Sequence, residues 1–175
     1  MVVIVMGVTG SGKTTVGRAL AQRMGWEFAD ADDFHSAENR AKMQAGVALT
    51  DADRAPWLDA LHTQMRAWSA MSKHVVLACS ALKQQYRERL TEGMDAAKIR
   101  FVWLDGPANL IEQRLGQREG HYMNPALLPS QIAALEPPAD ALRVSIAQDV
   151  PEIVQAICAQ LVPEGYAEEK SSRKR

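Results

Sequence analysis

The sequence predicts one α/β domain in which a parallel sheet is covered by helices on both faces. Short runs rich in Val, Ile and Leu alternate with amphipathic stretches along most of the 175 residues, a pattern typical of strands joined by crossover helices. The hydrophobic fraction of 47% and the charged fraction of 23% are sufficient for a sizeable core. The length is that of a single domain, and the chain contains no internal repeat.

Five apolar runs are predicted as buried strands, because strands that are covered on both faces are continuously apolar. In chain order they are Val2–Met6, 26–29, 75–79, 99–104 and 142–147, of which the second is the shortest. Their alternation with helical segments predicts a five-stranded sheet with all strands parallel.

Helical patterns separate these strands. Residues 15–24 form one pattern, and a further helix is expected to begin near Ser36. Pro56, Pro107 and Pro151 each precede a helical segment. Proline suits a first helical turn, so each is expected to mark a helix start. The segment after Pro56 has one apolar face, with three- and four-residue spacing, made of Trp57, Leu58, Leu61, Met65 and Trp68.

Two regions depart from the alternation. Residues 119–138 contain Gly120, four prolines and a short helical piece. They are predicted to form a lid, although a long connector would have a similar composition. Residues 163–175 are strongly charged and are predicted to be a disordered tail. The folded domain is therefore expected to span residues 1–162.

Charge and cysteine content exclude several classes of function. The formal net charge of -1 argues against a protein that coats nucleic acid or an anionic membrane. The two cysteines, Cys79 and Cys158, lie in apolar runs and are expected to be buried thiols rather than a disulfide framework. The opening apolar run is too short to cross a bilayer and lacks the features of a signal peptide. We therefore expect a cytoplasmic protein.

Residues 7–14 match the pattern G-x-x-x-x-G-K-[ST] in full, between a predicted strand and a predicted helix. The glycines let backbone N–H groups approach phosphate oxygens. Lys13 adds positive charge near the β- and γ-phosphates, and the Thr14 hydroxyl is a Mg²⁺ ligand. The sequence therefore predicts that the chain binds ATP or GTP with Mg²⁺. The residues expected to bind the nucleotide are Gly7, Thr9, Gly10, Ser11, Gly12, Lys13, Thr14 and Thr15.

Two common classes of nucleotide-binding protein are not indicated. A signalling GTPase needs an N-K-x-D base-reading motif and a D-x-x-G switch, and the sequence contains neither. A motor-type ATPase usually ends its third strand with an acid, whereas the run 75–79 leads into Ser80.

Carboxylates gather at the end of the second predicted strand, in the segment D-A-D-D-F-H of residues 30–35. Ligands bind at the carboxyl ends of parallel strands, so Asp30 and Asp32 are expected beside the phosphate loop. One can hold the Mg²⁺ water shell while the other accepts the proton of an attacking hydroxyl, and the residues alone leave open which does which. The alternatives are caps for the helix near Ser36, solvated acids, or a less favoured Asp/His metal site.

Further cationic and polar groups lie near strand ends and the lid. Arg114 and Arg118 are four residues apart on one helix face and lead into the lid. One could stack on adenine and the other neutralise the transferring phosphoryl group, although a solvated basic helix end is the alternative.

A second group of such residues suits an acceptor that carries hydroxyls and a negative charge, such as a sugar acid. Its members are Arg54, Ser80, Lys83 and Arg87. Each cation taken alone is also explained as a surface residue.

Six segments together resemble the gluconokinases, in the shikimate-kinase-like branch of P-loop kinases. They are the phosphate loop, D-A-D-D-F-H-S-A-E-N-R-A-K-M, L-T-D-A-D-R-A-P-W-L, A-C-S-A-L-K-Q-Q-Y-R, R-L-G-Q-R-E-G-H, and L-L-P-S-Q with L-E-P-P. The resemblance covers residues 2–161 and implies a P-loop NTPase fold with a five-stranded parallel sheet and a lid. It also implies phosphoryl transfer from MgATP to the 6-hydroxyl of D-gluconate, giving 6-phosphogluconate, in what is commonly a homodimer.

The resemblance also implies roles for individual residues. Asp32 would be the base and Asp30 would lie on the Mg²⁺ side, while Arg114 and Arg118 would be the adenine and phosphate arginines. Lys13 and Arg118 would stabilise charge on the transferring phosphoryl group. The acceptor-lining residues would be His35, Arg54, Ser80, Lys83, His121 and Gln131.

Two alternatives stay open. The acceptor could be shikimate, another sugar acid or a nucleoside monophosphate instead of gluconate. From a different class, the chain could be a non-catalytic ATP-binding module that holds a partner through the lid and the basic tail.

Overall fold

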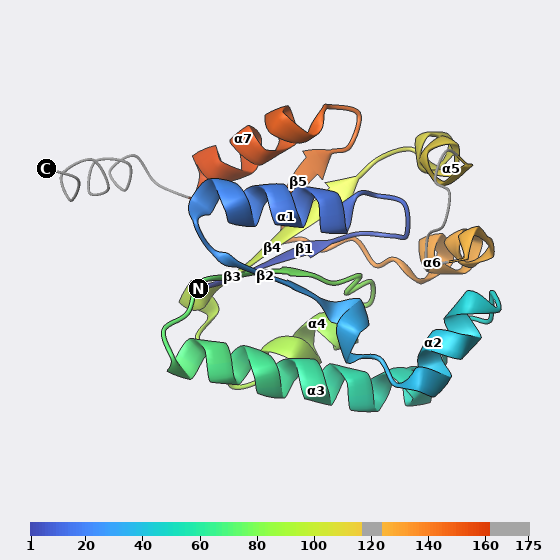
Figure 1. The fold of residues 1–175 in the computed structure, drawn as a ribbon, viewed down its shortest axis with the longest axis horizontal. Coiled ribbons are helices and arrows are strands. Elements are labelled where there is room, and N and C mark those ends of the chain that lie inside the picture. Colours follow the sequence, from blue (N-terminus) through green and yellow to red (C-terminus); the bar gives the residue numbers. More distant parts are fainter. Residues whose placement is uncertain (117–123, 162–175) are drawn as a thin grey trace, which may run out of the picture.

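A computed structural model describes residues 1–116 and 124–161, and its centre is a sheet of five parallel strands (Figure 1). The strands lie in the order β2-β3-β1-β4-β5. Their bounds are Val2–Met6 for β1, Glu27–Asp30 for β2, Val75–Ala78 for β3, Ile99–Asp105 for β4 and Leu142–Ser145 for β5. Every neighbouring pair is parallel. The predicted fold class and number of strands are therefore confirmed.

Two pairs of helices cover the two faces of the sheet (Figure 1). The helices α1 (Lys13–Met24) and α7 (Val150–Leu161) lie on one face, and α3 (Asp51–Ala70) and α4 (Gln84–Thr91) lie on the other. Alternate residues of a strand point to opposite faces. Val3 of β1 accordingly packs in the core under α1 and α7, whereas Ile4 packs in the core above α3.

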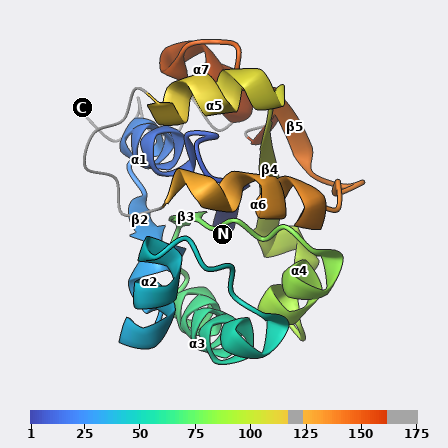
Figure 2. The same ribbon diagram turned by 90° about the vertical axis from the view of Figure 1, so that its right-hand side faces the viewer.

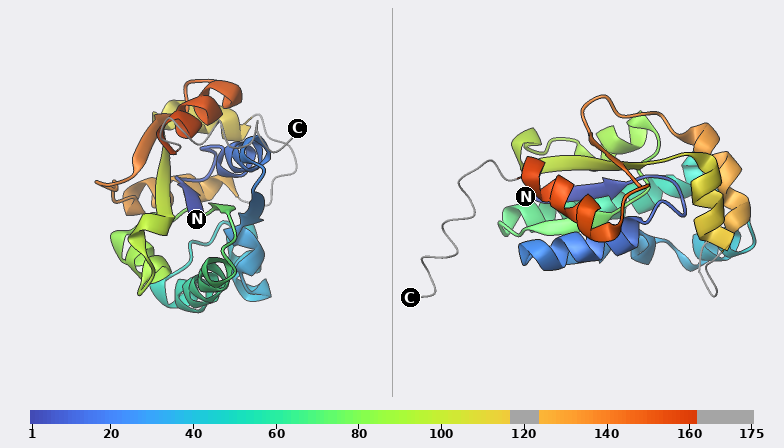
Figure 3. Two further views of the ribbon diagram at one scale, coloured as in Figure 1. Left: turned by 90° about the vertical axis from the view of Figure 1, so that its left-hand side faces the viewer. Right: turned by 90° about the horizontal axis from the view of Figure 1, so that it is seen from above.

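The remaining helices lie beyond the carboxyl ends of the strands or in connections. They are α2 (Ala37–Gln44), α5 (Ala108–Gly116) and α6 (Leu128–Ala134), with short 3-10 turns at Ala31–Phe34, Ala96–Lys98 and Pro125–Leu127. Figure 2, which faces the carboxyl ends, shows α6 crossing in front of the sheet with α5 above it and α2 below. In the view from above, α5 and α6 lie side by side at this end (Figure 3).

The strand bounds differ slightly from those predicted. The second strand is shifted by one residue, to Glu27–Asp30, and the runs 75–79 and 142–147 end as strands at Ala78 and Ser145. The expectation that all five strands are buried is confirmed for β1 and β3 and wrong for β2, β4 and β5, which contain exposed or half-buried residues. Of these three, β2 and β5 are edge strands, so each has a neighbour on one side only.

The prediction that Pro56 lies in a first helical turn is wrong, because α3 begins five residues earlier, at Asp51. Thr50 and Asp53 form a capping box, in which the Asp53 backbone N–H donates to the Thr50 hydroxyl at 3.1 Å. Proline in a helix leaves the carbonyl four residues before it without its N–H partner. That residue here is Ala52, which is exposed and can be hydrated. Because α3 starts earlier than predicted, Asp51 and Arg54 lie in its first turn.

The predicted lid, residues 119–138, is described from residue 124 onward, and this part carries α6. A small apolar cluster of Met43, Leu49 and Leu127 joins it to α2 and to the segment that follows α2. The Asn124 side-chain amide also donates to the Gln44 carbonyl at 3.2 Å. The predicted tail, residues 163–175, lies outside the described residues. Across residues 1–116 and 124–161, none of the helices is both long and apolar enough to cross a membrane.

Candidate active site

The phosphate loop connects β1 to α1, and its shape depends on glycine. Gly7 and Gly10 have φ angles of 144° and 78°, which side chains rarely adopt. A Cβ atom on Gly7 would lie 2.8 Å from the Leu104 carbonyl oxygen, and one on Gly10 would lie 2.7 Å from the Leu115 side chain. Any larger residue would therefore force the loop or its neighbours to move.

The end of this loop is built as an anion site. Lys13 is the first residue of α1, and its ammonium group donates to the Val8 carbonyl at 3.0 Å, across the loop. Gly12 occupies the N-cap and has no side chain to cap the first turn. The N–H groups and the positive end of the helix dipole are therefore directed at the loop, as a phosphate group requires.

The residues predicted to hold Mg²⁺ are neighbours. The Thr14 hydroxyl donates to Asp30 at 2.8 Å, and the other Asp30 carboxylate oxygen accepts from the Asp32 backbone N–H at 3.1 Å. Mg²⁺ is usually held in proteins by one or two oxygen ligands, several waters and substrate phosphates. One hydroxyl and one carboxylate beside a phosphate loop fit that ion. In the described part of the chain, no group of three or more His, Cys, Asp or Glu residues could hold a metal ion by itself.

Asp32 and Ser80 share one cavity with the phosphate loop. The residues that line it are Thr9, Gly10, Gly12, Lys13, Thr14, Asp30, Asp32, Ala78, Cys79 and Ser80. Burial raises the pKa of the Asp32 carboxyl, and the nearby negative charge of Asp30 raises it further, while Lys13 opposes the shift. A carboxylate with a raised pKa is a stronger proton acceptor than an ordinary aspartate.

The sequence predicted that both thiols are buried. Cys79 is fully buried and its pKa is raised to about 12 by burial, so it remains a neutral thiol although it lines the cavity. Cys158 is only half-buried, so the prediction is wrong for this residue, which lies on α7. Both cysteines are free.

His35 follows the turn that carries Asp32. Its ring stacks on Trp57 of α3, with centroids 4.4 Å apart, and it is buried. Burial and the charges of Arg54 and Arg40 lower its pKa to about 4, so the ring is neutral at pH 7. Within the described part of the chain, its Nδ1 atom is buried and has no hydrogen-bond partner. A ligand hydroxyl is one group that could satisfy it.

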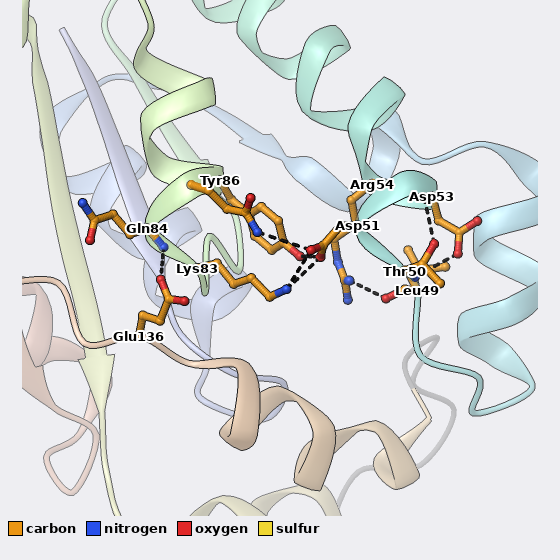
Figure 4. A network of polar contacts seen from close by, with 10 residues as sticks. Leu49, Thr50, Asp51, Asp53, Arg54, Lys83, Gln84, Tyr86 and Glu136 are labelled. Carbon is orange, nitrogen blue, oxygen red and sulfur yellow. Dashed lines mark hydrogen bonds and ion pairs between the residues drawn. The ribbon is translucent and has the colours of Figure 1, made fainter.

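Arg54 and Lys83 lie next to each other in a network between α3 and α4 (Figure 4). Lys83 Nζ pairs with both carboxylate oxygens of Asp51, at 2.8 and 2.9 Å. The Tyr86 hydroxyl also donates to Asp51. Arg54 donates to the Leu49 carbonyl, and its guanidinium lies 5.7 Å from the centroid of the Tyr86 ring. The sequence had indicated the two cations but not Asp51 or Tyr86.

The segment 80–83 is held by residues that do not face the cavity. Ala81 is buried and has a φ of 44°, which is unusual for a residue with a side chain. Arg87, which the sequence grouped with the acceptor cations, is instead buried and donates to the Ala81 and Leu82 carbonyls at 3.0 Å each. Glu136 accepts from the Gln84 backbone N–H at 2.5 Å, which ties the chain after α6 to the start of α4. Arg87 therefore supports the segment rather than extending into the site.

Two other predicted residues bind the protein itself. The Gln131 side-chain oxygen accepts from the Thr9 backbone N–H at 2.6 Å, so α6 contacts the phosphate loop directly. Arg114 donates to the Ile146 carbonyl at 2.6 Å, near the end of β5. Arg118 and His121 lie outside the described residues.

Comparisons with known proteins agree with this geometry. A family model described as an AAA domain matches residues 2–138. The chain is 46% identical to a probable gluconokinase of Mus musculus, over 91% of this chain and 97% of that protein. It is 48% identical to a gluconokinase of Gluconobacter oxydans (strain 621H), over 81% and 80% of the two chains. The solved structure of a gluconokinase from Sinorhizobium meliloti 1021 matches with a TM-score of 0.80 and 38% identity, over 99% of this chain and 97% of that one.

Proposed function

Because the chain belongs to the gluconokinase family, we propose that it transfers the γ-phosphoryl group of ATP to the 6-hydroxyl of D-gluconate, giving 6-phospho-D-gluconate and ADP. The observation that carries this proposal is the cavity in which the phosphate loop, Asp30 and Asp32 meet. A kinase needs a phosphate cradle and a proton acceptor within one site, and this cavity holds both.

The phosphate loop binds and orients the donor. Backbone N–H groups of the loop and of the N-terminus of α1 contact the phosphate oxygens, apart from those of Gly7, Thr9 and Ser11, which donate to protein oxygens. Lys13 places its ammonium group near the transferring phosphoryl group. Little covalent chemistry is required of the protein, because phosphoryl transfer depends mainly on positioning and on stabilising negative charge.

Asp32 is the residue we assign as the base. The 6-hydroxyl oxygen forms a bond to the γ-phosphorus, the bond between that phosphorus and the bridging oxygen breaks, and the hydroxyl proton passes to the Asp32 carboxylate. The raised pKa of Asp32 supports this assignment. Asp30 is less suited to it, because its oxygens already accept from the Thr14 hydroxyl and from a backbone N–H.

Thr14 and Asp30 are the residues we assign to Mg²⁺, on the strength of their 2.8 Å contact. When bound, Mg²⁺ neutralises charge on the β- and γ-phosphates. Arg114 and Arg118 are assigned to adenine and to the transferring phosphoryl group, and for Arg114 this requires its guanidinium to serve both the adenine ring and the Ile146 carbonyl.

The acceptor would be bound by the residues that the resemblance implies. Arg54 and Lys83 would pair with its carboxylate, and Ser80, on the wall of the cavity, would bind its hydroxyls. His35 would accept or donate a hydrogen bond as a neutral ring. His121 and Gln131 would contribute from the lid, the latter through its amide nitrogen, since its oxygen accepts from Thr9. Closure of the lid would exclude water and limit wasteful hydrolysis of ATP.

We further propose that the protein is a cytoplasmic homodimer, as the resemblance to gluconokinases implies. Light scattering on the purified protein would measure the mass directly, and a monomeric mass would contradict the dimer.

The test of the function is a panel of acceptors in a coupled assay of ADP release, with phosphorus NMR to locate the new ester. The panel contains D-gluconate, its epimers, shikimate and nucleoside monophosphates. We expect the highest kcat/KM with D-gluconate and a phosphate ester at its 6-position. Faster turnover of another acceptor would contradict the proposed substrate. Tight ATP binding without ADP release from any acceptor would support the non-catalytic module instead.

A further inference from the structure

Asp51 is the anionic centre of the network between α3 and α4 (Figure 4). It lies in the first turn of α3, and three side chains of residues 83–86 donate to its carboxylate. These are Lys83 at 2.8 and 2.9 Å, the Tyr86 hydroxyl, and the Gln85 amide at 3.3 Å. Hydrogen bonds from Lys83 and Tyr86 lower the pKa of Asp51 to about 2, so it is ionised at neutral pH.

Lys83, which pairs with Asp51, is also the cation that the proposed function assigns to the carboxylate of the acceptor. An ammonium group has three donors, and two of the contacts from Lys83 already go to the two oxygens of one carboxylate. A sugar acid that binds there would present the same chemical group in the same role. The two carboxylates would compete for one cation, because like charges placed side by side repel each other.

The ion pair between Lys83 and Asp51 is one in which another carboxylate can replace Asp51. The Lys83 and Asp51 side chains retain 26% and 53% of their accessible surface. Ion pairs with this degree of exposure contribute little net free energy. Arg54 lies nearby and uses one donor on the Leu49 carbonyl, so a guanidinium with five donors can still bind an incoming carboxylate.

We propose that Asp51 is an internal counter-ion that occupies Lys83 in the acceptor-free protein and is displaced by the carboxylate of the acceptor. This inference rests on the proposed function and names the feature of the acceptor that the site selects. An uncharged polyol has no group that replaces Asp51 on Lys83. Displacement of Asp51 from Lys83 by the acceptor carboxylate therefore favours acids over neutral sugars of the same length.

The test compares two variants that each remove one carboxylate from α3. Asp51→Asn removes the proposed counter-ion. Asp59→Asn is the matched control, because Asp59 also pairs with a cation of α4, Arg89, at 2.7 and 2.8 Å, but lies two helical turns away. Both variants change the net charge equally, so a general attraction for anions affects them alike.

For Asp51→Asn we expect the KM for D-gluconate to fall about two- to fivefold, the range that corresponds to an exposed ion pair. The KM for ATP should be unchanged, and Asp59→Asn should leave both KM values unchanged. A higher or unchanged KM for D-gluconate in Asp51→Asn would overturn the proposal, since it would mean that Asp51 positions Lys83 or has no influence on the acceptor.

A second variant keeps the proposal testable if Asp51→Asn folds poorly. Tyr86→Phe removes one donor to Asp51 without changing any charge, so the carboxylate should be displaced more easily and the KM for D-gluconate should fall by a smaller factor. A rise in that KM would contradict the proposed displacement of Asp51 by the acceptor carboxylate. Failure of the wild-type protein to phosphorylate D-gluconate at all would contradict the proposed function and is read from the same assay before any variant is measured.

Discussion

The two sides of the proposed active site are built in different ways. The phosphate-loop side, residues 7–14 with Asp30 and Asp32, relies on backbone N–H groups, tight glycine turns and a half-buried carboxylate. The proposed acceptor side, Arg54, Ser80 and Lys83 with Asp51, relies mainly on long side chains and a partly exposed ion pair. A backbone cradle tolerates little change, whereas side chains on helix starts can be exchanged or repositioned. The chemistry is therefore expected to be sensitive on the first side and the choice of acceptor adjustable on the second.

The largest expected effect tests whether the phosphate-loop side carries the chemistry. Asp32→Asn should lower kcat by about 10²- to 10⁴-fold, because the variant lacks a proton acceptor, while the KM for ATP stays near that of the wild type. Steady-state kinetics with D-gluconate measures both. Asp33→Asn is the control, because Asp33 is the exposed neighbouring residue and should retain near-normal turnover. Near-normal kcat in Asp32→Asn would remove Asp32 as the base.

The next prediction addresses the acceptor side alone. Arg54→Gln should raise the KM for D-gluconate about 10- to 100-fold, the loss expected when a charged donor to a carboxylate is removed, and leave the KM for ATP unchanged. Arg66→Gln, on an exposed position of the same helix, should change neither value. A parallel rise in both KM values for Arg54→Gln would mean that the two sides are not separable.

A third prediction concerns the rigidity of the phosphate-loop side. Gly7→Ala should destabilise the fold by about 1–3 kcal/mol, because the new Cβ would collide with the Leu104 carbonyl and the φ angle of 144° would be strained. Urea denaturation followed by circular dichroism measures this. For comparison, a Cβ on Gly116 would meet no described atom within 4 Å, so Gly116→Ala should shift stability by less than about 0.5 kcal/mol. Equal stability of the two variants would show that the loop is more adaptable than its geometry indicates.

The smallest expected effect at neutral pH, one that grows only as the pH falls, lies where the two sides meet, at His35. Burial lowers the pKa of His35 to about 4 in the folded protein, from about 6.5 in the unfolded chain, so the unfolded state binds more protons between these values. Stability should therefore be lost as the pH falls from about 6.5 to 4, by about 3 kcal/mol from this residue. His35→Phe should reduce that loss in pH-dependent urea titrations, while retaining the stacking on Trp57. An identical pH dependence in both proteins would mean that the folded state accommodates a charged His35.

Much of the fold and half of the site could be predicted from local sequence. The phosphate loop was identified from eight consecutive residues, because its function depends on backbone shape and the glycines that permit it. The position of Asp30 and Asp32 beside the phosphate loop followed from the general rule that ligands bind at the carboxyl ends of parallel strands. The error at Pro56 arose because a capping box whose N-cap, Thr50, lies six residues upstream determines where α3 begins.

The sequence by itself determined the fold class, the phosphate loop and the location of the carboxylates, because these depend on periodicity, backbone conformation and strand ends. Only the tertiary structure decided that Lys83 is paired with Asp51, that Arg87 is buried as a support, and that Gln131 contacts Thr9. The Lys83 and Gln131 contacts join residues 32 and 122 positions apart. Arg87 is near its partners in sequence, but its burial depends on the elements packed around it. Whether a surface-type side chain faces solvent, a ligand or another side chain is set by helix packing, which no local pattern encodes.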